Sequence, residues 1–300
     1  MSRFKLAAAQ YPVDRLERWE DYRAKLQRWV AEAAEAGARL LVFPEYASME
    51  LASLFGDEVA ASLSAQLQAL QTVLADYRQL HAELARRYGV YLLAGSFPVR
   101  DEDGLYRNRA YLYGPDGGEE FQDKLIMTRF ENEQWGISAG RELKVFDTAL
   151  GRLGVCICYD SEFPLLARAQ VEAGADLILV PSCTDTDAGY HRVRLSAQAR
   201  ALENQCYAVQ SPLVGEAPWS AAVDVNLGAA AVYTPVDYGF PANGVLAQGE
   251  RDRPQWVYAE VDLARARELR GSGQVLNFRD WPRQAAPVGG GVSLRSLRGG

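Results

Sequence analysis

The alternation of apolar and polar residues in the first third of the chain predicts β-strands separated by amphipathic helices. Leu6 to Gln10 is a short apolar run, and from Asp14 to Ala36 apolar residues recur at gaps of three and four, as on one face of a helix. Ala38 to Phe43 is almost continuously apolar, which is typical of a buried strand. A helical stretch from about Leu63 to Arg87 and an apolar run from Val90 to Phe97 repeat this order. We therefore expect two β-α-β units here.

The rest of the chain predicts further strands, joined partly by hairpins and partly by helices. Two hairpins are predicted, each with a glycine-containing turn between its strands. The first pairs Asn108 to Tyr113 with Glu119 to Met127, and the second pairs Val145 to Ala149 with Leu153 to Cys158. Helices are expected at about Phe163 to Ala173 and Arg192 to Glu203. Later strands are expected at Asp176 to Pro181, Tyr207 to Val214, Ala229 to Tyr233 and Trp256 to Val261. Because hairpins make some strands antiparallel, this pattern favours a layered α/β sandwich over a barrel of parallel strands.

Length and composition are those of an ordinary soluble globular protein. The chain has 300 residues, of which 48% are hydrophobic and 24% charged, and this suits one large domain over residues 1–283. Residues 284–300 are rich in glycine and poor in apolar side chains. They predict a mobile tail, or an arm that becomes ordered against a partner.

Charge and hydropathy exclude several classes of partner. The formal net charge is −7, and no cluster of lysine and arginine could neutralise a row of phosphates, so nucleic acid is not expected as a partner. The first apolar stretch is too short for a signal peptide, and no run approaches the roughly eighteen apolar residues of a membrane span. We expect a cytoplasmic protein that does not bind membranes. Its four cysteines, Cys156, Cys158, Cys183 and Cys206, lie in apolar or strand-like surroundings, which suits reduced thiols.

Cys158 lies at the expected end of a short buried strand, shortly before a helix is predicted to begin. Ligand sites in open α/β sheets lie just beyond the carboxyl ends of strands, so this thiol is a candidate nucleophile. Histidine is the usual activating partner of such a thiol. The chain contains only His81, in a polar helical stretch, and His191, in a segment that leads into a helix. We therefore expect other groups to activate Cys158.

Two side chains at other strand ends could supply that activation. Glu45 follows the run that ends at Pro44, and Lys124 follows the strand after Glu119. The ammonium of Lys124 would favour the thiolate and stabilise an oxyanion, while Glu45 would transfer protons. Lys124 could not be the base, because its ordinary pKa is about 10.4. Together with backbone donors at the start of the following helix, these groups suit acyl transfer.

Three motifs carry a resemblance to a known family: Phe43-Pro44-Glu45, Asp123-Lys124-Leu125, and Cys158-Tyr159-Asp160 followed by Phe163-Pro164. In order and rough spacing they resemble the motifs of the nitrilase, or carbon-nitrogen hydrolase, superfamily, and the resemblance covers most of residues 4–280. It implies a four-layer α-β-β-α sandwich of mixed sheets. It also implies a homodimer or higher homo-oligomer that associates across a helical face near the site, and no metal or organic cofactor.

The resemblance also implies roles for single residues. Glu45, Lys124 and Cys158 would be the catalytic triad, and Tyr159 would help to position the substrate. Many members use a second glutamate for positioning. Counting back from Gly140 favours Glu133 and leaves Glu131 open, although Ala139 replaces the family's proline and Asp123 stands where an arginine often precedes the lysine. Further side chains could border the pocket: Tyr46, Asn132, Thr184 and His191.

The Cys-Tyr-Asp motif resembles the amidase and carbamoylase branches more than true nitrilases, which more often carry Cys-Trp-Glu. The implied reaction is hydrolysis, by water, of a small amide or N-carbamoyl compound through a thioester. Nitrile hydrolysis, or transfer of the acyl group to another acceptor, would use the same thioester. Two alternatives of other classes stay open: a glycosidase with two carboxylates, such as Glu45 and Glu162, and a non-catalytic assembly or regulatory module.

Overall fold

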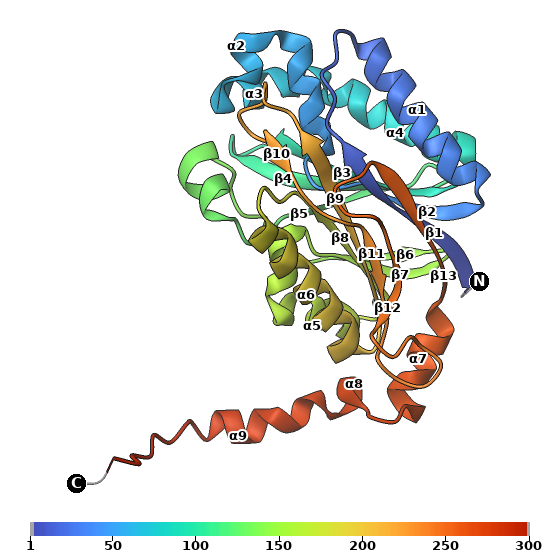
Figure 1. Ribbon diagram of the computed structural model, residues 1–300, viewed down its shortest axis with the longest axis vertical. Helices are drawn as coiled ribbons and strands as arrows, with labels where there is room; N and C mark the ends of the chain where they lie inside the picture. Colours follow the sequence, from blue (N-terminus) through green and yellow to red (C-terminus); the bar gives the residue numbers. More distant parts are fainter. Residues whose placement is uncertain (1–2, 299–300) are drawn as a thin grey trace.

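The computed structural model describes residues 3–298 and places two β-sheets face to face between two layers of helices (Figure 1). The first sheet has the strand order β13-β1-β2-β3-β4-β5. Its strands are β1 (Arg3–Pro12), β2 (Ala38–Val42), β3 (Tyr91–Arg100), β4 (Tyr106–Tyr113), β5 (Glu119–Asp123) and β13 (Gln255–Asp262). Strands β1 to β3 are parallel, whereas β4, β5 and β13 pair with their neighbours in antiparallel fashion. This sheet is therefore mixed, as the sequence predicts.

The second sheet has the strand order β6-β7-β8-β9-β11-β12, and β10 also pairs with β9. Its strands are β6 (Val145–Thr148), β7 (Gly151–Val155), β8 (Leu177–Ser182), β9 (Tyr207–Glu216), β10 (Val225–Asn226), β11 (Ala231–Tyr233) and β12 (Val245–Gln248). Only β7, β8 and β9 are parallel to one another. The two sheets join where β1 pairs with β9, through Tyr11 with Leu213 and Pro12 with Val214. This junction makes the combined sheet nearly closed.

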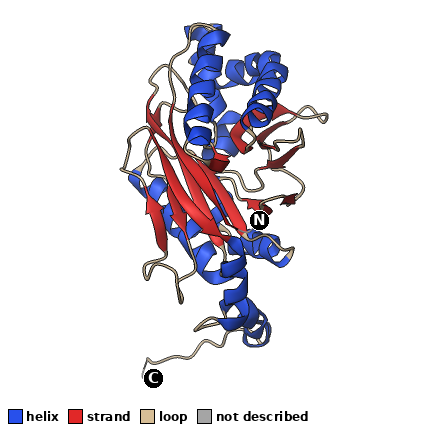
Figure 2. Cartoon of the chain, turned by 90° about the vertical axis from the view of Figure 1, so that its right-hand side faces the viewer, coloured by secondary structure: helices blue, strands red, loops and turns tan. Residues whose placement is uncertain are grey.

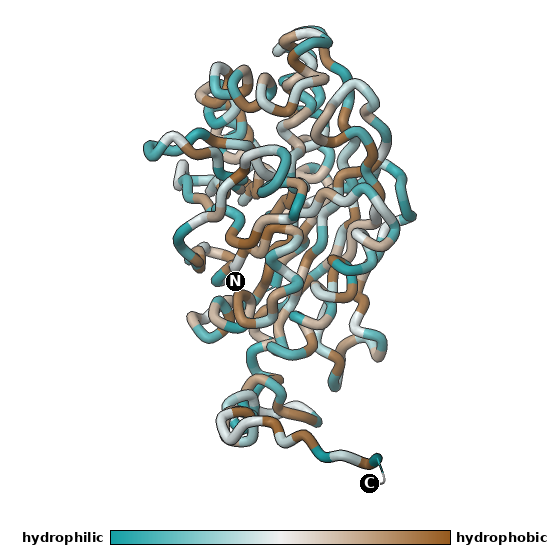
Figure 3. The backbone as a smooth tube through the Cα atoms, turned by 90° about the vertical axis from the view of Figure 1, so that its left-hand side faces the viewer, coloured by the Kyte–Doolittle hydropathy of each residue, from teal (hydrophilic) through white to brown (hydrophobic). Residues whose placement is uncertain are grey.

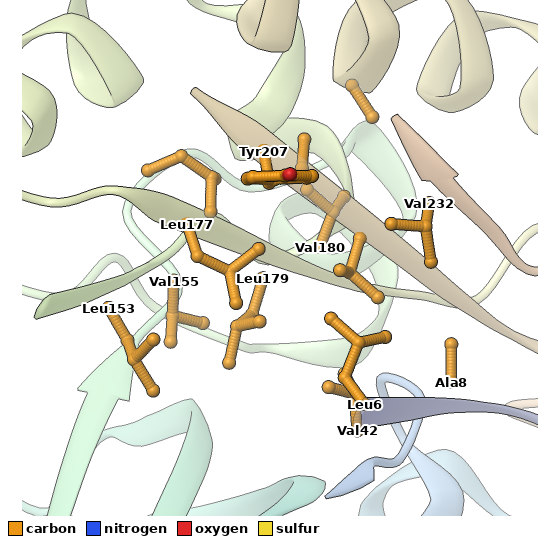
Figure 4. Packing of buried hydrophobic residues seen from close by; sticks show 14 of the residues in the cluster. Leu6, Ala8, Val42, Leu153, Val155, Leu177, Leu179, Val180, Tyr207 and Val232 are labelled. Carbon is orange, nitrogen blue, oxygen red and sulfur yellow. The ribbon is translucent and has the colours of Figure 1, made fainter. Parts of the chain in front are cut away.

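Alternation along β1 explains the layers. Leu6 and Ala8 belong to the apolar cluster between the sheets, whereas Ala7 and Ala9 belong to the cluster under the helices. Figure 4 shows Leu6 and Val42 of the first sheet opposite Leu179 of the second. Every β1 residue from Leu6 to Tyr11 is buried, because both faces of the sheet are covered.

Four helices form the outer layers. α1 (Trp19–Glu35) and α4 (Leu74–Tyr88) cover the first sheet, and α5 (Pro164–Glu172) and α6 (Asp187–Asn204) cover the second (Figures 1 and 2). The expected four-layer α-β-β-α architecture is confirmed. Among residues 3–298, no helix combines the length and apolar character that a membrane span needs.

Several predicted boundaries are wrong for identifiable reasons. The first helix starts at Trp19 and not at Asp14, because the N–H groups of Asp14 and Leu16 are bound by side chains of a neighbouring segment. The strand expected to reach Cys158 ends at Val155. The strand expected to reach Met127 ends at Asp123, and the N–H groups of Leu125 and Ile126 donate to the carboxylate of Asp160 and not to a neighbouring strand.

Other elements were placed inaccurately or not predicted. Thr186 caps α6, so this helix begins before the expected Arg192. The predicted helical stretch from Leu63 consists of α3 (Leu63–Leu70), a 3-10 turn η2 (Gln71–Val73) and α4. Elements without a prediction include η1 (Ala47–Phe55), α2 (Asp57–Ala60), η3 (Phe130–Trp135), β10, β12 and α7 (Leu263–Ser272).

The C-terminal segment follows α7 and extends away from the body of the molecule at its end (Figure 3). It contains α8 (Asn277–Asp280), η5 (Trp281–Gln284) and α9 (Ala285–Gly289). Phe278 packs against Arg168 of α5, but every residue from Pro282 to Arg298 is exposed. Residues 299 and 300 of the expected tail, and residues 1 and 2 of the expected domain, lie outside the described residues.

Candidate active site

Glu45 lies in a sharp turn directly after β2. The turn is held on both sides by β3: the N–H of Phe43 donates to the carbonyl of Leu93 at 2.9 Å, and the N–H of Tyr46 donates to Ser96 Oγ at 2.8 Å. Gly95 permits this approach, because a Cβ there would lie 2.1 Å from the carbonyl oxygen of Pro44. Tyr46 itself has a left-handed backbone, with φ 58°. The turn buries the Glu45 side chain, which is 1% exposed.

Lys124 follows β5 and is fixed through its own backbone. Its N–H donates to the carbonyl of Asn108 at 2.8 Å, and its carbonyl accepts from the N–H of Gly140 at 2.7 Å. A Cβ on Gly140 would lie 2.6 Å from the Cβ of Asp123, so glycine is needed here. The buried ammonium Nζ donates to Glu45 Oε1 at 2.8 Å and to Glu131 Oε2 at 2.6 Å.

Glu131 lies on η3, a π-helical turn, and its side chain is almost fully enclosed by hydrogen-bond donors. Oε1 accepts from the hydroxyl of Tyr46 at 2.7 Å and from Asn108 Nδ2 at 3.1 Å. Oε2 accepts from Lys124 and from both the N–H and the hydroxyl of Thr128, each of the latter at 2.9 Å. Asn108 Nδ2 also donates to Glu45 Oε1 at 2.8 Å, so one amide joins the two carboxylates.

The preference for Glu133 as the second glutamate needs correction. Glu133 points outward, is 48% exposed and forms a two-pronged ion pair with Arg129, at 2.8 and 2.9 Å. The π-helical turn directs residues 131 and 133 to opposite sides, so only one of them can reach Lys124. Glu131, the alternative left open by the sequence, is the residue that contacts it.

Cys158 is the first residue of a short 3-10 turn, η4 (Cys158–Glu162), and has a left-handed backbone with φ 48°. Its Sγ lies 3.8 Å from the carbonyl oxygen of Cys183, whose N–H donates to Glu45 Oε2 at 2.9 Å. The same peptide segment therefore contacts both the thiol and the carboxylate. Asp160 joins the Cys158 turn to the segment after Lys124, because its carboxylate accepts from the N–H groups of Ile157 and Ile126.

Burial and charge set the protonation states of the cluster. Burial raises the pKa of Glu45 above its ordinary value, although Lys124 opposes this shift. Burial alone would lower the pKa of Lys124, but Glu131 and Glu45 outweigh it and the pKa is raised well above the ordinary value. Burial would likewise raise the pKa of Glu131, yet Lys124 and the hydrogen bonds from Thr128 and Tyr46 bring it below the ordinary value. Lys124 is therefore cationic and Glu131 anionic at neutral pH.

The thiol of Cys158 is neutral in this arrangement. Burial and the negative charge of Glu45 raise the pKa of Cys158 well above its ordinary value, and Lys124 only partly offsets them. The sequence-based expectation that Lys124 favours the thiolate is therefore correct in direction but insufficient in size. A base must remove the thiol proton during the reaction, and the Cys158 thiol is one of the hydrogen-bond partners that lower the pKa of Glu45.

Glu45, Lys124, Glu131 and Cys158 line one cavity of about 530 Å³. Of the other predicted pocket residues, Tyr46, Tyr159 and Thr184 line it, whereas Asn132 and His191 do not. Both are exposed, and His191 packs beside Tyr190 on α6. The sequence did not single out four further lining residues: Phe130 and Trp135 on η3, Arg129 directly before it, and Arg192 on α6. Two loop residues, Asp185 and Asp224, also line the cavity. Within residues 3–298, no group of three or more His, Cys, Asp or Glu side chains could hold a metal ion.

A family model described as "Carbon-nitrogen hydrolase" matches residues 5–271. The chain is 36% identical over 276 residues to "Probable hydrolase YhcX" of Bacillus subtilis (strain 168), an alignment that covers 92% of this chain and 53% of YhcX. It therefore spans about half the length of that relative. It is also 29% identical over 280 residues to "Omega-amidase NIT2" of Danio rerio, covering 90% of this chain and 92% of NIT2.

Solved structures show the same fold. Nit3 of Saccharomyces cerevisiae, described as a member of branch 10 of the nitrilase superfamily, superimposes with a TM-score of 0.71 at 21% identity, covering 90% of this chain and 94% of Nit3. The C. elegans NitFhit protein gives a TM-score of 0.74 at 24% identity, covering 90% of this chain and 63% of NitFhit. Three buried polar side chains and a thiol thus share one cavity in a chain with this architecture.

Proposed function

Because the chain belongs to the carbon-nitrogen hydrolase family, we propose that it hydrolyses a small amide or N-carbamoyl compound through a thioester on Cys158. Its hydrolase and omega-amidase relatives support an amidase-like enzyme. The observation that carries the proposal is the buried contact of Lys124 with Glu45 and Glu131, in the cavity that also contains the Cys158 thiol.

In the first half of the reaction, Glu45 takes the thiol proton as Sγ of Cys158 attacks the carbonyl carbon of the substrate. The negative charge moves to the substrate oxygen, where the Lys124 ammonium stabilises it. An ammonium group has three donors, and Lys124 uses two of them on carboxylates within the described part of the chain. The third donor is free for the oxyanion. Collapse of the intermediate breaks the C–N bond, and the protonated Glu45 gives its proton to the departing nitrogen.

In the second half, water replaces the amine. Glu45, again ionised, takes a proton from a water molecule that attacks the thioester carbonyl. The C–S bond then breaks, the acid leaves, and Glu45 returns the proton to the thiolate of Cys158. The raised pKa of Glu45 suits this double role, because it brings the acid and base forms closer in free energy at neutral pH.

Glu131 acts as the positioning glutamate in this proposal. Its contacts with Lys124, Tyr46 and Asn108 fix the direction of the ammonium group. Because Glu131 is fully hydrogen-bonded and ionised, it holds Lys124 in the charged form without taking part in proton transfer. Tyr159, which lines the cavity next to the nucleophile, is the proposed substrate-positioning aromatic residue.

Two related reactions differ only in the bond attacked or the final acceptor. Nitrile hydrolysis and acyl transfer would form the same thioester, and neither is favoured by a specific contact. The two-carboxylate glycosidase is set aside, because the family is one of carbon-nitrogen hydrolases and Glu45 is hydrogen-bonded to Lys124. A non-catalytic module is set aside because the relatives are hydrolases.

We also propose that two or more copies associate through α5 and α6. These helices carry exposed leucines, with exposed fractions of 70% for Leu165, 58% for Leu195 and 40% for Leu202. Apolar side chains gathered on neighbouring helices are typical of a contact between subunits. Size-exclusion chromatography with light scattering checks this, and replacing Leu165 and Leu195 by lysine should yield the monomer.

The proposed function is tested by measuring ammonia release from primary amides, N-carbamoyl compounds and nitriles. We expect amides or N-carbamoyl compounds to react best, and Cys158→Ala to abolish turnover. Cys206→Ala is the matched control, since Cys206 is a buried thiol outside the cavity. Mass spectrometry should detect the acyl group on Cys158, and Lys124→Met should prevent its formation. Turnover retained by a folded Cys158→Ala variant would contradict the proposal.

A further inference from the structure

The charged side chains around the cavity differ in whether they already have partners of opposite charge in the described part of the protein. Its three cationic side chains all have carboxylate partners. Lys124 contacts Glu45 and Glu131, Arg129 contacts Glu133 with two nitrogens, and Arg192 lies 3.4 Å from Glu162. An anionic ligand at the entrance would therefore have to displace a carboxylate from its arginine.

Two carboxylates that line the same cavity have no such partner within residues 3–298. Asp185 and Asp224 line it from two separate loops, one that leads from β8 into α6 and one that precedes β10. Within residues 3–298, neither side chain forms an ion pair or accepts a hydrogen bond. Both are exposed, so they are open to a ligand that enters the cavity.

The negative charge of Asp185 acts on a thiol inside the cavity. Cys183 lines the same space, and Asp185 is one of the negative groups that raise the pKa of its thiol, after burial and Glu45. Glu162 is a further carboxylate of this wall, where it pairs with Arg192. In all, five carboxylates and three cations line the cavity, which gives its wall a formal charge of −2 when the thiols are neutral.

We propose that the substrate carries an ammonium or guanidinium group at the end remote from the bond that is cut. This inference rests on the proposed function, because it assigns the amide end to Cys158 and the cationic end to Asp185 and Asp224. A cationic end meets carboxylates that have no partner in the described part of the protein, whereas an anionic end meets none of the cations free. Field lines from several carboxylates in one concave wall also attract cations from solution.

Three primary amides of equal chain length test the charge preference: 6-aminohexanamide, hexanamide and adipamic acid. We expect kcat/KM to be highest for the first and lowest for the last, and the difference to shrink as sodium chloride is added. Because both aspartates are exposed, we expect Asp185→Asn and Asp224→Asn each to lower the ratio of 6-aminohexanamide to hexanamide by about threefold to fivefold.

Asp116→Asn is the matched control. Asp116 is an exposed aspartate in the turn between β4 and β5, outside the cavity, so its replacement changes the net charge equally. We expect the substrate ratio to stay unchanged in this variant. An equal fall in all three variants would indicate a general effect of net charge and would overturn the assignment to Asp185 and Asp224.

Binding distinguishes this inference from the proposed function. In Cys158→Ala, calorimetric titration measures affinity for the three amides without turnover. Tighter binding of 6-aminohexanamide that Asp185→Asn weakens supports the cationic end, even if no amide is hydrolysed. Equal binding of all three amides, or tighter binding of adipamic acid, overturns it even if hexanamide is hydrolysed through Cys158.

Discussion

Two buried lysines in this protein form similar contacts and serve different purposes. Lys124 bridges Glu45 and Glu131 at 2.8 and 2.6 Å. Lys25 of α1 contacts Glu50 at 2.6 Å and Asp14 at 2.9 Å, under the helices that cover the first sheet. Both ammonium groups are almost inaccessible, with exposed fractions of 1% and 4%. Burial of a paired charge alone therefore does not identify a catalytic group.

The two clusters differ in whether every N–H donor of the lysine has an acceptor. Lys25 has three acceptors, since it also donates to the carbonyl of Pro12 at 2.6 Å. Glu50 in turn accepts from Lys25, from the hydroxyl of Tyr11 and from the N–H of Asp14. We call Lys25, Glu50, Tyr11 and Asp14 the structural cluster. Lys124, by contrast, keeps one donor without an acceptor among residues 3–298 and lines a cavity that contains a thiol, which is the difference that allows chemistry.

The largest expected effect comes from Glu45→Gln. The amide keeps the size of the side chain but cannot take the thiol proton, so kcat should fall about 10³- to 10⁴-fold. Ammonia release from the best amide measures this, and circular dichroism should show an unchanged fold. Glu50→Gln is the matched change in the structural cluster and should keep kcat. A similar loss of kcat in both variants would mean that the two clusters are not separate.

Substitutions in the structural cluster should lower the stability of the protein and leave kcat unchanged. Lys25→Met leaves Glu50 buried without its counter-ion, which should lower the free energy of unfolding by about 3–5 kcal/mol. Urea denaturation measures this change, and kcat at a temperature where the variant is folded should be unchanged. The double variant Lys25→Met/Glu50→Gln should recover part of the loss, because no uncompensated charge remains. Additive losses would contradict the ion-pair interpretation.

The sequence predicted the two clusters unequally. Glu45, Lys124 and Cys158 each follow a strand within a recognisable motif, so the order of residues alone was enough to select them. Lys25 and Glu50 belong to no such motif, and Glu50 lies on a 3-10 element that no periodicity indicated. Most strands and a layered α/β arrangement followed from apolar patterns, whereas the four layers followed from the family resemblance. The choice between Glu131 and Glu133 depended on which side of η3 meets Lys124, a tertiary contact that local sequence does not specify.

The contribution of the peptide backbone was also beyond the sequence. The N–H of Cys183 holds Glu45, although the two residues are far apart in the chain and follow strands of different sheets, β8 and β2. Similarly, Gly95 and Gly140 are needed because backbone segments approach them closely, and such contacts depend on how whole strands are packed. Tertiary contacts of this kind leave no periodic signal.

The next prediction separates the two regions by pH. His81 of α4 is buried in the same helical layer as the structural cluster, and burial lowers its pKa from 6.5 to about 4. Between pH 6.5 and 4, His81 therefore binds a proton in the unfolded chain but stays neutral in the folded protein. This contribution to stability is fully present above pH 6.5 and is lost as the pH falls to 4, by about 3 kcal/mol in total.

His81→Gln isolates this effect from the buried carboxylates, whose raised pKa values act in the opposite direction. Urea midpoints of the two proteins, measured from pH 7 to 4, should show a steeper acid loss for the natural protein. The activity of folded enzyme should fall separately, as the pH drops through the raised pKa of Glu45. Identical pH profiles of stability would show that His81 does not titrate in this window.

The smallest expected effect tests why the active cluster has one carboxylate more than it has cations. In Glu131→Gln, Lys124 keeps Glu45 as its single carboxylate partner, whereas Lys25 keeps both Glu50 and Asp14. We expect kcat to fall about a hundredfold, because the amide cannot fix the ammonium as strongly. Glu133→Gln, two residues away and outside the cavity, should change kcat for hexanamide less than about twofold.

The pH dependence of kcat/KM provides a second, independent test of the role of Glu131. The charge of Glu131 is one of the causes that raise the pKa of Glu45, so its removal lowers that pKa. In Glu131→Gln the acid limb of kcat/KM should therefore move to lower pH, while the maximal rate is reduced. A merely structural role of Glu131 would reduce the rate and leave the acid limb in place. An unchanged acid limb would thus show that the extra carboxylate orients Lys124 without tuning the base.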